Sequence, residues 1–326
     1  MPERRRAIFF GSPEFAVPCL EVVATATDLR AVVCQPDRPA GRGKQLHEPA
    51  VKAAARRLGL PVLQPEKIRT PEFEAGLRAH GAEIFVVVAY GRILPPSLLA
   101  LPALGPWNVH ASLLPRLRGA APIQWAIIRG EQLTGVAVMR MEEGLDTGPV
   151  AATAETSIAD DDTAGTLSAR LAQLGAALLA ETLPRIAAGR APLVAQDDRA
   201  ATLAPPLEKE DGRLDFTKPA HAVSARARGV DPWPGATAIL DGEVIKLFRP
   251  RVVGAREMAA ASTLSPAPGP APAGAGRVLR AGPDGLIVAC GDGAVAFAEL
   301  QLPGRKRLAT SVVLNGRPIA PGARLG

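Results

Sequence analysis

Three short segments of the chain are apolar at every position, namely residues 7–10 (AIFF), 31–34 (AVVC) and 84–89 (IFVVVA). A strand with one solvent-facing side alternates apolar and polar residues, so an unbroken apolar run predicts a strand that is covered on both faces. Helix signals fill the intervening sequence, such as Thr70 as an N-cap before Pro71. We therefore predict an α/β domain over residues 1–189, with a Rossmann-like, mostly parallel sheet and flanking helices.

The first predicted strand ends at Gly11, and we expect Ser12 to cap a helix whose first residue is Pro13. A strand, a glycine and a helix start in this order are typical of nucleotide-binding folds. The pattern Gly-x-Gly-x-x-Gly is missing, however, and no acidic residue closes the next strand in the usual place. The sequence therefore excludes a nicotinamide dinucleotide site at this position.

The pattern of the chain changes near residue 190. Residues 190–210 lose their periodicity and pass through Ala204-Pro205-Pro206, which predicts a linker. Beyond it, short alternating segments are divided by Asp241-Gly242, Asp284-Gly285 and Gly291-Asp292-Gly293, which is typical of β-hairpins. We therefore predict a smaller β-barrel domain over residues 211–326, interrupted by an irregular, mobile Ala/Pro-rich insert at residues 254–276.

Charge is distributed unevenly between these two parts. Residues 1–210 carry 23 basic and 23 acidic side chains, whereas residues 211–326 carry 15 and 9, so the whole net charge of +6 lies in the C-terminal part. A basic module joined to a neutral one favours a polyanionic partner. A solvated basic surface is the alternative that composition leaves open.

Polar side chains mark the end of another predicted strand, residues 107–110. Asn108 and His110 alternate along it and so project from the same face, and four residues that suit a flat heterocyclic ligand follow: Ser112, Leu113, Leu114 and Pro115. Ligands of parallel sheets bind beyond the carboxyl ends of the strands, which favours a binding site here. A structural histidine is the alternative. A helix is predicted to begin at Pro122.

These residues resemble a known family. The run from Trp107 to Gln124 is similar to the Asn-x-His-x-Ser-Leu-Leu-Pro signature of the folate-dependent formyltransferases, and Met141–Gly148 is similar to the loop that carries their catalytic aspartate. The resemblance implies 10-formyltetrahydrofolate as the formyl donor, no metal, and a catalytic group of Asn108, His110 and Asp146. It also implies folate contacts from Tyr90, Ser112, Leu113, Leu114 and Pro115, and an OB-like form for the C-terminal barrel. The chain departs from the family pattern at Ala111 and Leu117.

A basic loop points to the acceptor. Residues 35–44 (QPDRPAGRGK) closely resemble an insertion of the methionyl-tRNA formyltransferases, which implies formylation of initiator methionyl-tRNA. We therefore expect tRNA contacts from Arg38, Arg42 and Lys44 in this loop and from the C-terminal cluster of Arg305, Lys306 and Arg307. Two alternatives stay open: a formyltransferase for a small amine, such as an amino-sugar nucleotide or glycinamide ribonucleotide, and an RNA-binding protein on an inactive transferase scaffold.

The remaining signals concern the cellular setting and the core. Cys19, Cys34 and Cys290 are isolated in the sequence, which predicts reduced structural thiols and no metal site. No signal-peptide pattern and no long apolar run are present, so we expect a cytoplasmic protein without membrane contact. The sequence indicates no obligatory protein partner, and we expect a monomer. Trp233, between two prolines, is expected to lie in the core.

Overall fold

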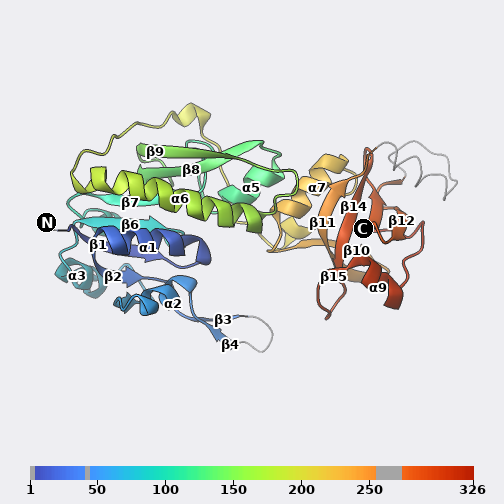
Figure 1. The fold of residues 1–326 in the computed structure, drawn as a ribbon, viewed down its shortest axis with the longest axis horizontal. Coiled ribbons are helices and arrows are strands. Elements are labelled where there is room, and N and C mark those ends of the chain that lie inside the picture. The colour runs from blue at the N-terminus through green and yellow to red at the C-terminus, as the bar shows by residue number, and fades with distance from the viewer. Residues whose placement is uncertain (1–3, 41–44, 255–273) are drawn as a thin grey trace. The chain divides into compact units, whose positions relative to one another are not determined.

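The structure, a computed structural model, describes residues 4–40, 45–254 and 274–326 (Figure 1). The chain forms two compact units. The first comprises Met1–Pro122, Leu133–Ser157 and Ser168–Pro205, and the second comprises Ile123–Gln132, Ile158–Leu167 and Pro206–Gly326. Most of the predicted insert at residues 254–276 lies outside the described residues. Within the described parts of the chain, no helix is both long and apolar enough to span a membrane.

A seven-stranded sheet, in the order β5-β2-β1-β6-β7-β8-β9, forms the centre of the first unit as described. Neighbouring strands from β5 to β7 run parallel, whereas β8 is antiparallel to both β7 and β9. The strands are β1 (Arg6–Gly11), β2 (Asp28–Val33), β5 (Val62–Leu63), β6 (Ile84–Val88), β7 (Pro106–His110), β8 (Leu133–Arg140) and β9 (Val150–Ser157). The predicted mostly parallel sheet is confirmed.

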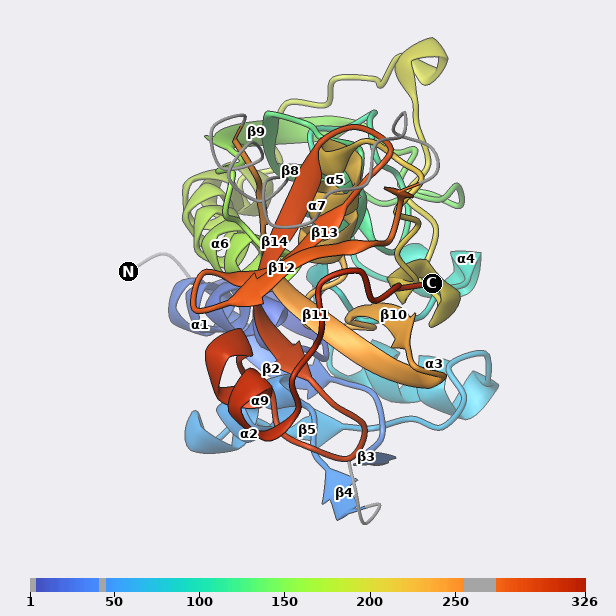
Figure 2. The same cartoon turned by 90° about the vertical axis from the view of Figure 1, so that its right-hand side faces the viewer.

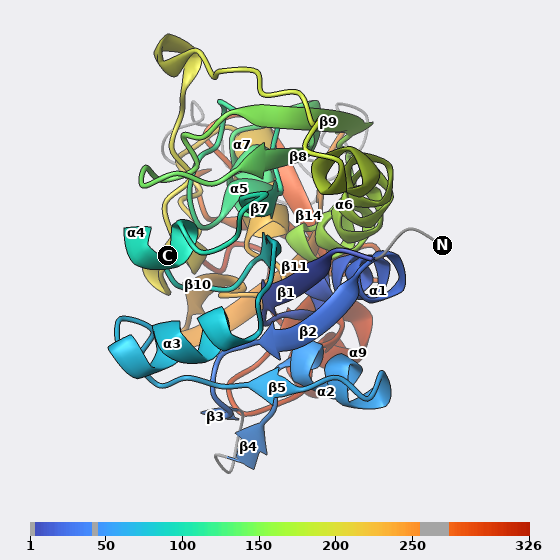
Figure 3. The ribbon, with the colours of Figure 1, turned by 90° about the vertical axis from the view of Figure 1, so that its left-hand side faces the viewer.

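Helices cover both faces of this sheet, which explains the unbroken apolar runs. Figure 3 shows α1 (Val17–Ala26), α2 (Ala50–Arg57) and α6 (Ala164–Ala187) along one face and α3 (Pro71–Ala79) and α4 (Pro96–Leu99) along the other. Within β1, Ile8 and Phe10 belong to a core cluster with Leu77 of α3 and Leu98 of α4, and Phe9 between them is also fully buried. Strands that are buried on both sides leave no position for a polar side chain.

The connection after β1 differs from the sequence prediction. A 3₁₀ turn, η1 (Glu14–Ala16), comes first, and α1 begins only at Val17. The Ser12 hydroxyl caps neither element; it accepts from the Gln35 backbone N–H at 3.1 Å and donates to the Tyr90 carbonyl at 3.4 Å. The capping role predicted for Ser12 is therefore wrong, because its hydroxyl joins the ends of three neighbouring strands instead. Thr70 does cap α3, accepting from the Phe73 N–H.

The second unit, as described, contains an antiparallel sheet in the order β10-β11-β14-β13-β12, with β15 paired to β14 (Figure 2). Its elements are β10 (Ala236–Leu240), β11 (Glu243–Val252), β12 (Val278–Gly282), β13 (Gly285–Ala289), β14 (Ala294–Gln301), β15 (Leu308–Ala309), α7 (Ala220–Gly229), α9 (Thr310–Gly316) and most of α5 (Pro122–Ile128). All three predicted hairpin turns are present: Asp241-Gly242 joins β10 to β11, Pro283-Asp284 joins β12 to β13 one residue earlier than predicted, and residues 290–293 join β13 to β14. Among the described strands β10 and β12 do not pair, so the closed OB-like barrel is not confirmed.

The prediction that Trp233 lies in the core is wrong, since 54% of this residue is exposed. Polar contacts hold its loop in place of apolar burial. The Pro234 carbonyl accepts from the Lys246 ammonium group at 2.7 Å, and the Asp231 carboxylate accepts from the Arg307 guanidinium at 3.1 Å. The Asp231 side chain and the Pro234 backbone thus hold the loop on both sides of Trp233, and burial of the indole is not required to hold it.

The three cysteines are buried and form no disulfide, as predicted. Burial raises the pKa of the Cys19 thiol to about 12 and that of the Cys34 thiol to about 11. A thiol with so high a pKa stays protonated near neutral pH and is a poor nucleophile. These cysteines therefore act as small apolar core residues.

The predicted basic loop contains a short hairpin, formed by β3 (Arg38–Ala40) and β4 (Gln45–His47), whose tip lies outside the described residues. Asp37, at its base, accepts from Gln64 at 2.7 Å and from the buried Lys52 ammonium group at 2.6 Å. The hydrogen bonds from Gln64 and Lys52 lower the pKa of the Asp37 carboxyl below its ordinary value. Ionised Asp37 therefore anchors the base of the hairpin to Lys52 of α2 and to Gln64, which follows β5.

Replacing Asp37 by Asn should loosen this hairpin, because Lys52 would be left buried beside a neutral amide. In the unchanged chain the carboxylate's stabilisation is present above the ordinary Asp pKa, and it should be lost as the pH falls through the lowered pKa of Asp37. Amide NMR signals of Arg38, Ala40 and residues 45–47 should show this loosening in Asp37→Asn at pH 7, and in the wild type only at a pH below the ordinary pKa of an aspartate. Asp28→Asn, which removes an exposed ion pair to Arg30, is the control. Unchanged hairpin signals in Asp37→Asn at pH 7 would show that the Asp37 carboxylate does not anchor the hairpin.

Candidate active site

β7 carries both polar residues that the sequence placed at a strand end. Asn108 and His110 lie two positions apart and so share a face of the sheet, with His110 as the last residue of the strand. His110 is buried, whereas Asn108 is half-buried. The side-chain amide of Asn108 makes no hydrogen bond to another described residue, which leaves two N–H donors for a ligand.

The imidazole of His110 lies between a carbonyl and a carboxylate. Its Nε2 is 3.0 Å from the Leu117 carbonyl oxygen, and its Nδ1 is 3.6 Å from Oδ2 of Asp146. A carbonyl oxygen can only accept, so Nε2 carries a proton and Nδ1 is the atom that faces Asp146. A proton placed on Nδ1 would be held between the ring and the carboxylate. Two of the predicted catalytic residues, 36 positions apart in the chain, are thus brought together.

Asp146 adopts an unusual backbone conformation on the loop between β8 and β9. Its φ angle of +53° lies in the left-handed region, which costs about 1–2 kcal/mol for a residue with a Cβ. The Asp146 carboxylate accepts from the Gly119 N–H at 2.8 Å, and its side chain is only 15% exposed. Leu117 is also left-handed, at +58°, so backbone strain is concentrated on both sides of His110.

The predicted folate-contacting residues follow β7 in a tight loop. The Ser112 hydroxyl is fully buried and donates to the Arg116 carbonyl at 2.6 Å, which holds the turn between these residues. Leu113, Leu114 and Pro115 are half-buried and present apolar surface. Leu113 packs over Gly135 of β8, where a Cβ would lie 2.6 Å from its side chain. The loop therefore combines a fixed backbone with an apolar wall, as a site for a flat ring requires.

Tyr90 lies apart from this group. Its ring is buried in the core cluster and packs edge-on against Phe10, with ring centroids 5.5 Å apart. Burial raises the pKa of its hydroxyl to about 12, and that hydroxyl makes no hydrogen bond to a described residue. The Tyr90 backbone carbonyl accepts from Gln35 and Ser12. In this structure the tyrosine therefore supports the strand ends from the core side.

A further group of residues, which no sequence motif indicated, lies against the site. The Thr202 hydroxyl accepts from the Leu117 N–H at 2.9 Å, the Thr202 carbonyl accepts from Arg118, and Ala204 donates back to the Arg118 carbonyl. Gln196, in the same segment, hydrogen-bonds the Asp146 loop. These residues fall in the stretch predicted as a linker. Its length without periodicity was the only available signal, since such stretches are often functional.

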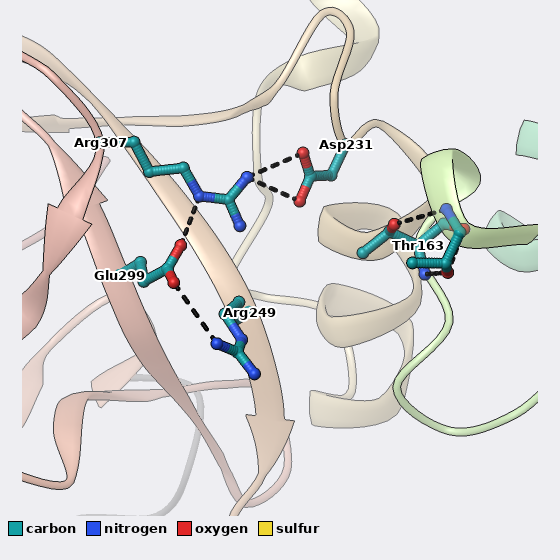
Figure 4. A network of polar contacts seen from close by, with 6 residues as sticks. Thr163, Asp231, Arg249, Glu299 and Arg307 are labelled. Atoms are coloured by element: carbon teal, nitrogen blue, oxygen red, sulfur yellow. Dashed lines mark hydrogen bonds and ion pairs between the residues drawn. The ribbon is translucent and has the colours of Figure 1, made fainter. Parts of the chain in front are cut away.

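The predicted tRNA-contacting residues have different surroundings. Arg38 is exposed on β3, whereas Arg42 and Lys44 lie outside the described residues. Arg305 and Lys306 are exposed before β15. Arg307 instead donates to both oxygens of Asp231 at 3.1 Å and to Glu299 (Figure 4). Its guanidinium also lies 4.0 Å from the centre of the Phe248 ring. Its charge is therefore committed to protein groups of the second unit.

Both parts of the chain match known protein families. Residues 5–183 match the model described as formyl transferase, and residues 206–318 match the model of the formyl transferase C-terminal domain. The chain is 46% identical over 321 residues to the methionyl-tRNA formyltransferase of Sorangium cellulosum, covering 98% of this chain and 99% of that protein. It is 47% identical to the methionyl-tRNA formyltransferase of Myxococcus xanthus, covering 98% of each.

Solved structures agree in fold. An N-formyltransferase from Helicobacter canadensis, in complex with folinic acid and dTDP-3-aminofucose, is similar with a TM-score of 0.62 at 16% identity, over 90% of this chain and 98% of that one. HypX from Aquifex aeolicus, in complex with tetrahydrofolic acid, gives a TM-score of 0.61 at 16% identity, over 96% of this chain and 47% of that one. On its sequence relatives and both family models, the chain belongs to the formyl transferase family, and within it to the methionyl-tRNA formyltransferases.

Proposed function

We propose that the chain transfers the formyl group of 10-formyltetrahydrofolate to the α-amino group of methionyl initiator tRNA. The observation that carries the proposal is the His110–Asp146 pair at the end of β7 beside the unpaired amide of Asn108, in a chain 46% identical to a methionyl-tRNA formyltransferase. The presence of all three residues, Asn108, His110 and Asp146, argues against the alternative of an inactive scaffold that only binds RNA.

The residues at this site suit such a formyl donor. A formyl oxygen accepts hydrogen bonds, and the Asn108 amide offers it two N–H groups that bond to no other described residue. The half-buried surfaces of Leu113, Leu114 and Pro115, beside the fixed Ser112 turn, suit the flat ring of a folate. When bound, the donor supplies an activated formyl carbon. We include Tyr90 as an indirect contributor, whose backbone carbonyl joins the ends of the neighbouring strands by accepting from Ser12 and Gln35.

The proposed chemistry assigns one role to each polar group. When the methionyl amine attacks the formyl carbon, negative charge builds on the formyl oxygen, and the Asn108 amide stabilises it by hydrogen bonding. The amine must lose a proton, and the His110–Asp146 pair receives it at Nδ1, where the carboxylate stabilises the charged ring. The bond from the formyl carbon to the folate nitrogen then breaks, and that nitrogen takes up the proton as tetrahydrofolate leaves. The reference pKa of an α-amino group is about 7.7–8.0, so free amine is available near neutral pH.

We assign tRNA binding to two basic regions. The hairpin at residues 38–47 contributes Arg38, Arg42 and Lys44, and the segment before β15 contributes Arg305 and Lys306, while Arg307 fixes that segment to Asp231. The proposed division is a catalytic domain at residues 1–189, a connecting stretch at 190–210 and a tRNA-binding domain at 211–326. All the proposed catalytic side chains come from one chain, so we propose a monomer, acting in the cytoplasm where charged tRNA is used.

An acceptor comparison tests the function directly. The protein is incubated with 10-formyltetrahydrofolate and, in parallel, with methionyl initiator tRNA, free methionine, a nucleotide-linked amino sugar or glycinamide ribonucleotide. We expect formyl transfer to the charged tRNA at a rate at least a hundredfold above that to any small amine. Preferred formylation of a small amine would favour the related enzymes that act on such acceptors.

The catalytic pair yields a second expectation. His110→Ala and Asp146→Ala should each lower kcat by roughly 10²–10⁴-fold, the range for loss of a proton-transfer or charge-stabilising group. The double variant should lose little more than either single one, because the two residues act as a unit. His221→Ala, at an exposed histidine of α7, is the control. A folded His110→Ala protein with near-normal turnover would exclude the imidazole from the mechanism.

Arg305 and Lys306 are expected to affect tRNA binding, whereas Arg307 is expected to affect the stability of the second unit. Arg305→Ala combined with Lys306→Ala should weaken tRNA binding and reduce its dependence on salt, by a slope of roughly 0.7–0.9 for each phosphate that is no longer neutralised. Arg307→Ala should instead lower the thermal stability of the second unit, since Asp231 is buried and would lose its partner. Arg57→Ala with Lys67→Ala, two exposed cations of the first unit, is the control. An unchanged salt slope would place the phosphate contacts elsewhere.

A further inference from the structure

The loop that carries Asp146 has to reach along the sheet to meet His110. Because β8 is antiparallel to β7, the last residue of β8, Arg140, pairs with Trp107 near the start of β7, whereas His110 is at its end. Residues 142–145 of the loop are exposed, so apolar packing does not hold them. The position of the carboxylate therefore depends on polar contacts farther along the loop.

Gln196 supplies two of these contacts. Its side-chain amide nitrogen donates to the Asp146 carbonyl at 2.8 Å and to the Gly148 carbonyl at 2.7 Å, using both hydrogens. The backbone near Gln196 is itself fixed, because Val194 and Val150 exchange two hydrogen bonds of 2.9 Å at the start of β9. The Gln196 amide thus binds the loop backbone on both sides of Thr147, and the pairing of Val194 with Val150 fixes the backbone close to Gln196.

Arg118 determines which way this amide faces. Its buried guanidinium donates to Oε1 of Gln196 through Nε at 3.1 Å and Nη2 at 2.9 Å, and Nη2 also donates to Asp198 at 2.7 Å. A guanidinium has only donors, so the amide oxygen must face it and the amide nitrogen must face the loop carbonyls. Arg118 adjoins Gly119, whose N–H binds the Asp146 carboxylate. The network therefore ties the loop after β7 to the loop after β8.

We propose that Gln196 is a positioning residue for formyl transfer, which holds the Asp146 carboxylate toward His110 through the loop backbone, with Arg118 orienting its amide. The proposal rests on the proposed role of the His110–Asp146 pair. The pair is 3.6 Å apart, longer than a hydrogen bond, so a small displacement of the loop decides whether the carboxylate can stabilise a proton on Nδ1. A misplacement of about 1 Å in a catalytic site can cost roughly a hundredfold in rate.

Gln196→Glu tests the positioning role, because a glutamate side chain has almost the same size and shape as glutamine. The ionised glutamate keeps its acceptor toward Arg118 but has no hydrogen to donate, and it faces two carbonyl oxygens. We expect kcat to fall roughly tenfold to hundredfold while the KM values for the folate and the tRNA change less than threefold. Gln132→Glu is the matched control, since that exposed glutamine makes one long bond of 3.4 Å to a carbonyl. If Gln196→Glu does not fold, Gln196→Met, which also lacks the two donors, replaces it.

A double-mutant cycle separates positioning from general support of the structure. If Gln196 acts through Asp146, Gln196→Glu should lower kcat less than twofold in an Asp146→Ala background. A residue that only supports the fold would cost the same factor in both backgrounds. Equal losses in the two backgrounds, or a fully active Gln196→Glu protein, would overturn the proposal.

Hydrogen exchange distinguishes this result from a failure of the proposed function. Backbone amides of residues 142–148 should exchange several-fold faster in Gln196→Glu than in the wild type and the Gln132→Glu control, whatever the acceptor is. If the wild-type protein does not formylate charged tRNA but exchange is still faster in Gln196→Glu, then tRNA is not the acceptor, while the contact between Gln196 and the Asp146 loop is supported. Unchanged exchange would overturn the positioning role independently of any activity.

Discussion

The candidate site depends on one buried histidine held between two loops. His110 ends β7 with Nε2 on the Leu117 carbonyl and Nδ1 toward Asp146, and both of those residues have left-handed backbones. Such conformations persist only where surrounding contacts enforce them. Here the enforcing contacts are the hydrogen bond that the Leu117 N–H donates to the Thr202 hydroxyl and the hydrogen bonds that Asp146 accepts from Gly119 and Gln196. The imidazole is thus oriented by Leu117 and Asp146, and residues far away in the chain hold these two in their strained backbone conformations.

The sheet explains why these loops meet. Five neighbouring strands, β5 to β7, run parallel and are covered on both faces, so their carboxyl ends present loops at one edge. Ser12, Gln35 and Tyr90 are joined by hydrogen bonds just beyond the ends of β1, β2 and β6. The antiparallel β8 breaks this regularity. Its loop does not begin at the same edge and needs its own anchors to deliver Asp146.

The second unit uses its charges in two ways. Arg307 donates to Asp231 and Glu299, and Glu299 also lies 3.5 Å from Arg249, so several of its charges neutralise one another inside the unit (Figure 4). Arg305 and Lys306, next to Arg307 in the chain, are exposed. A run of basic residues in a sequence is therefore not a uniform binding surface, because the geometry of each strand end decides which cations meet a carboxylate.

The long buried strands, the helix start at Thr70 and the hairpin turns of the second unit could be predicted from the sequence, because apolar periodicity, caps and turn residues act over a few neighbouring positions. The short strands β3, β4, β5 and β15 were not predicted, since two or three residues are too few to show a periodicity. The family signature also identified the catalytic residues that we propose. Tertiary structure alone decided the partners of Ser12, the exposure of Trp233, the ion pairs of Arg307 and the contacts of Gln196 with the Asp146 loop. Each of these depends on a polar group finding a partner far away in the chain, which no local pattern records.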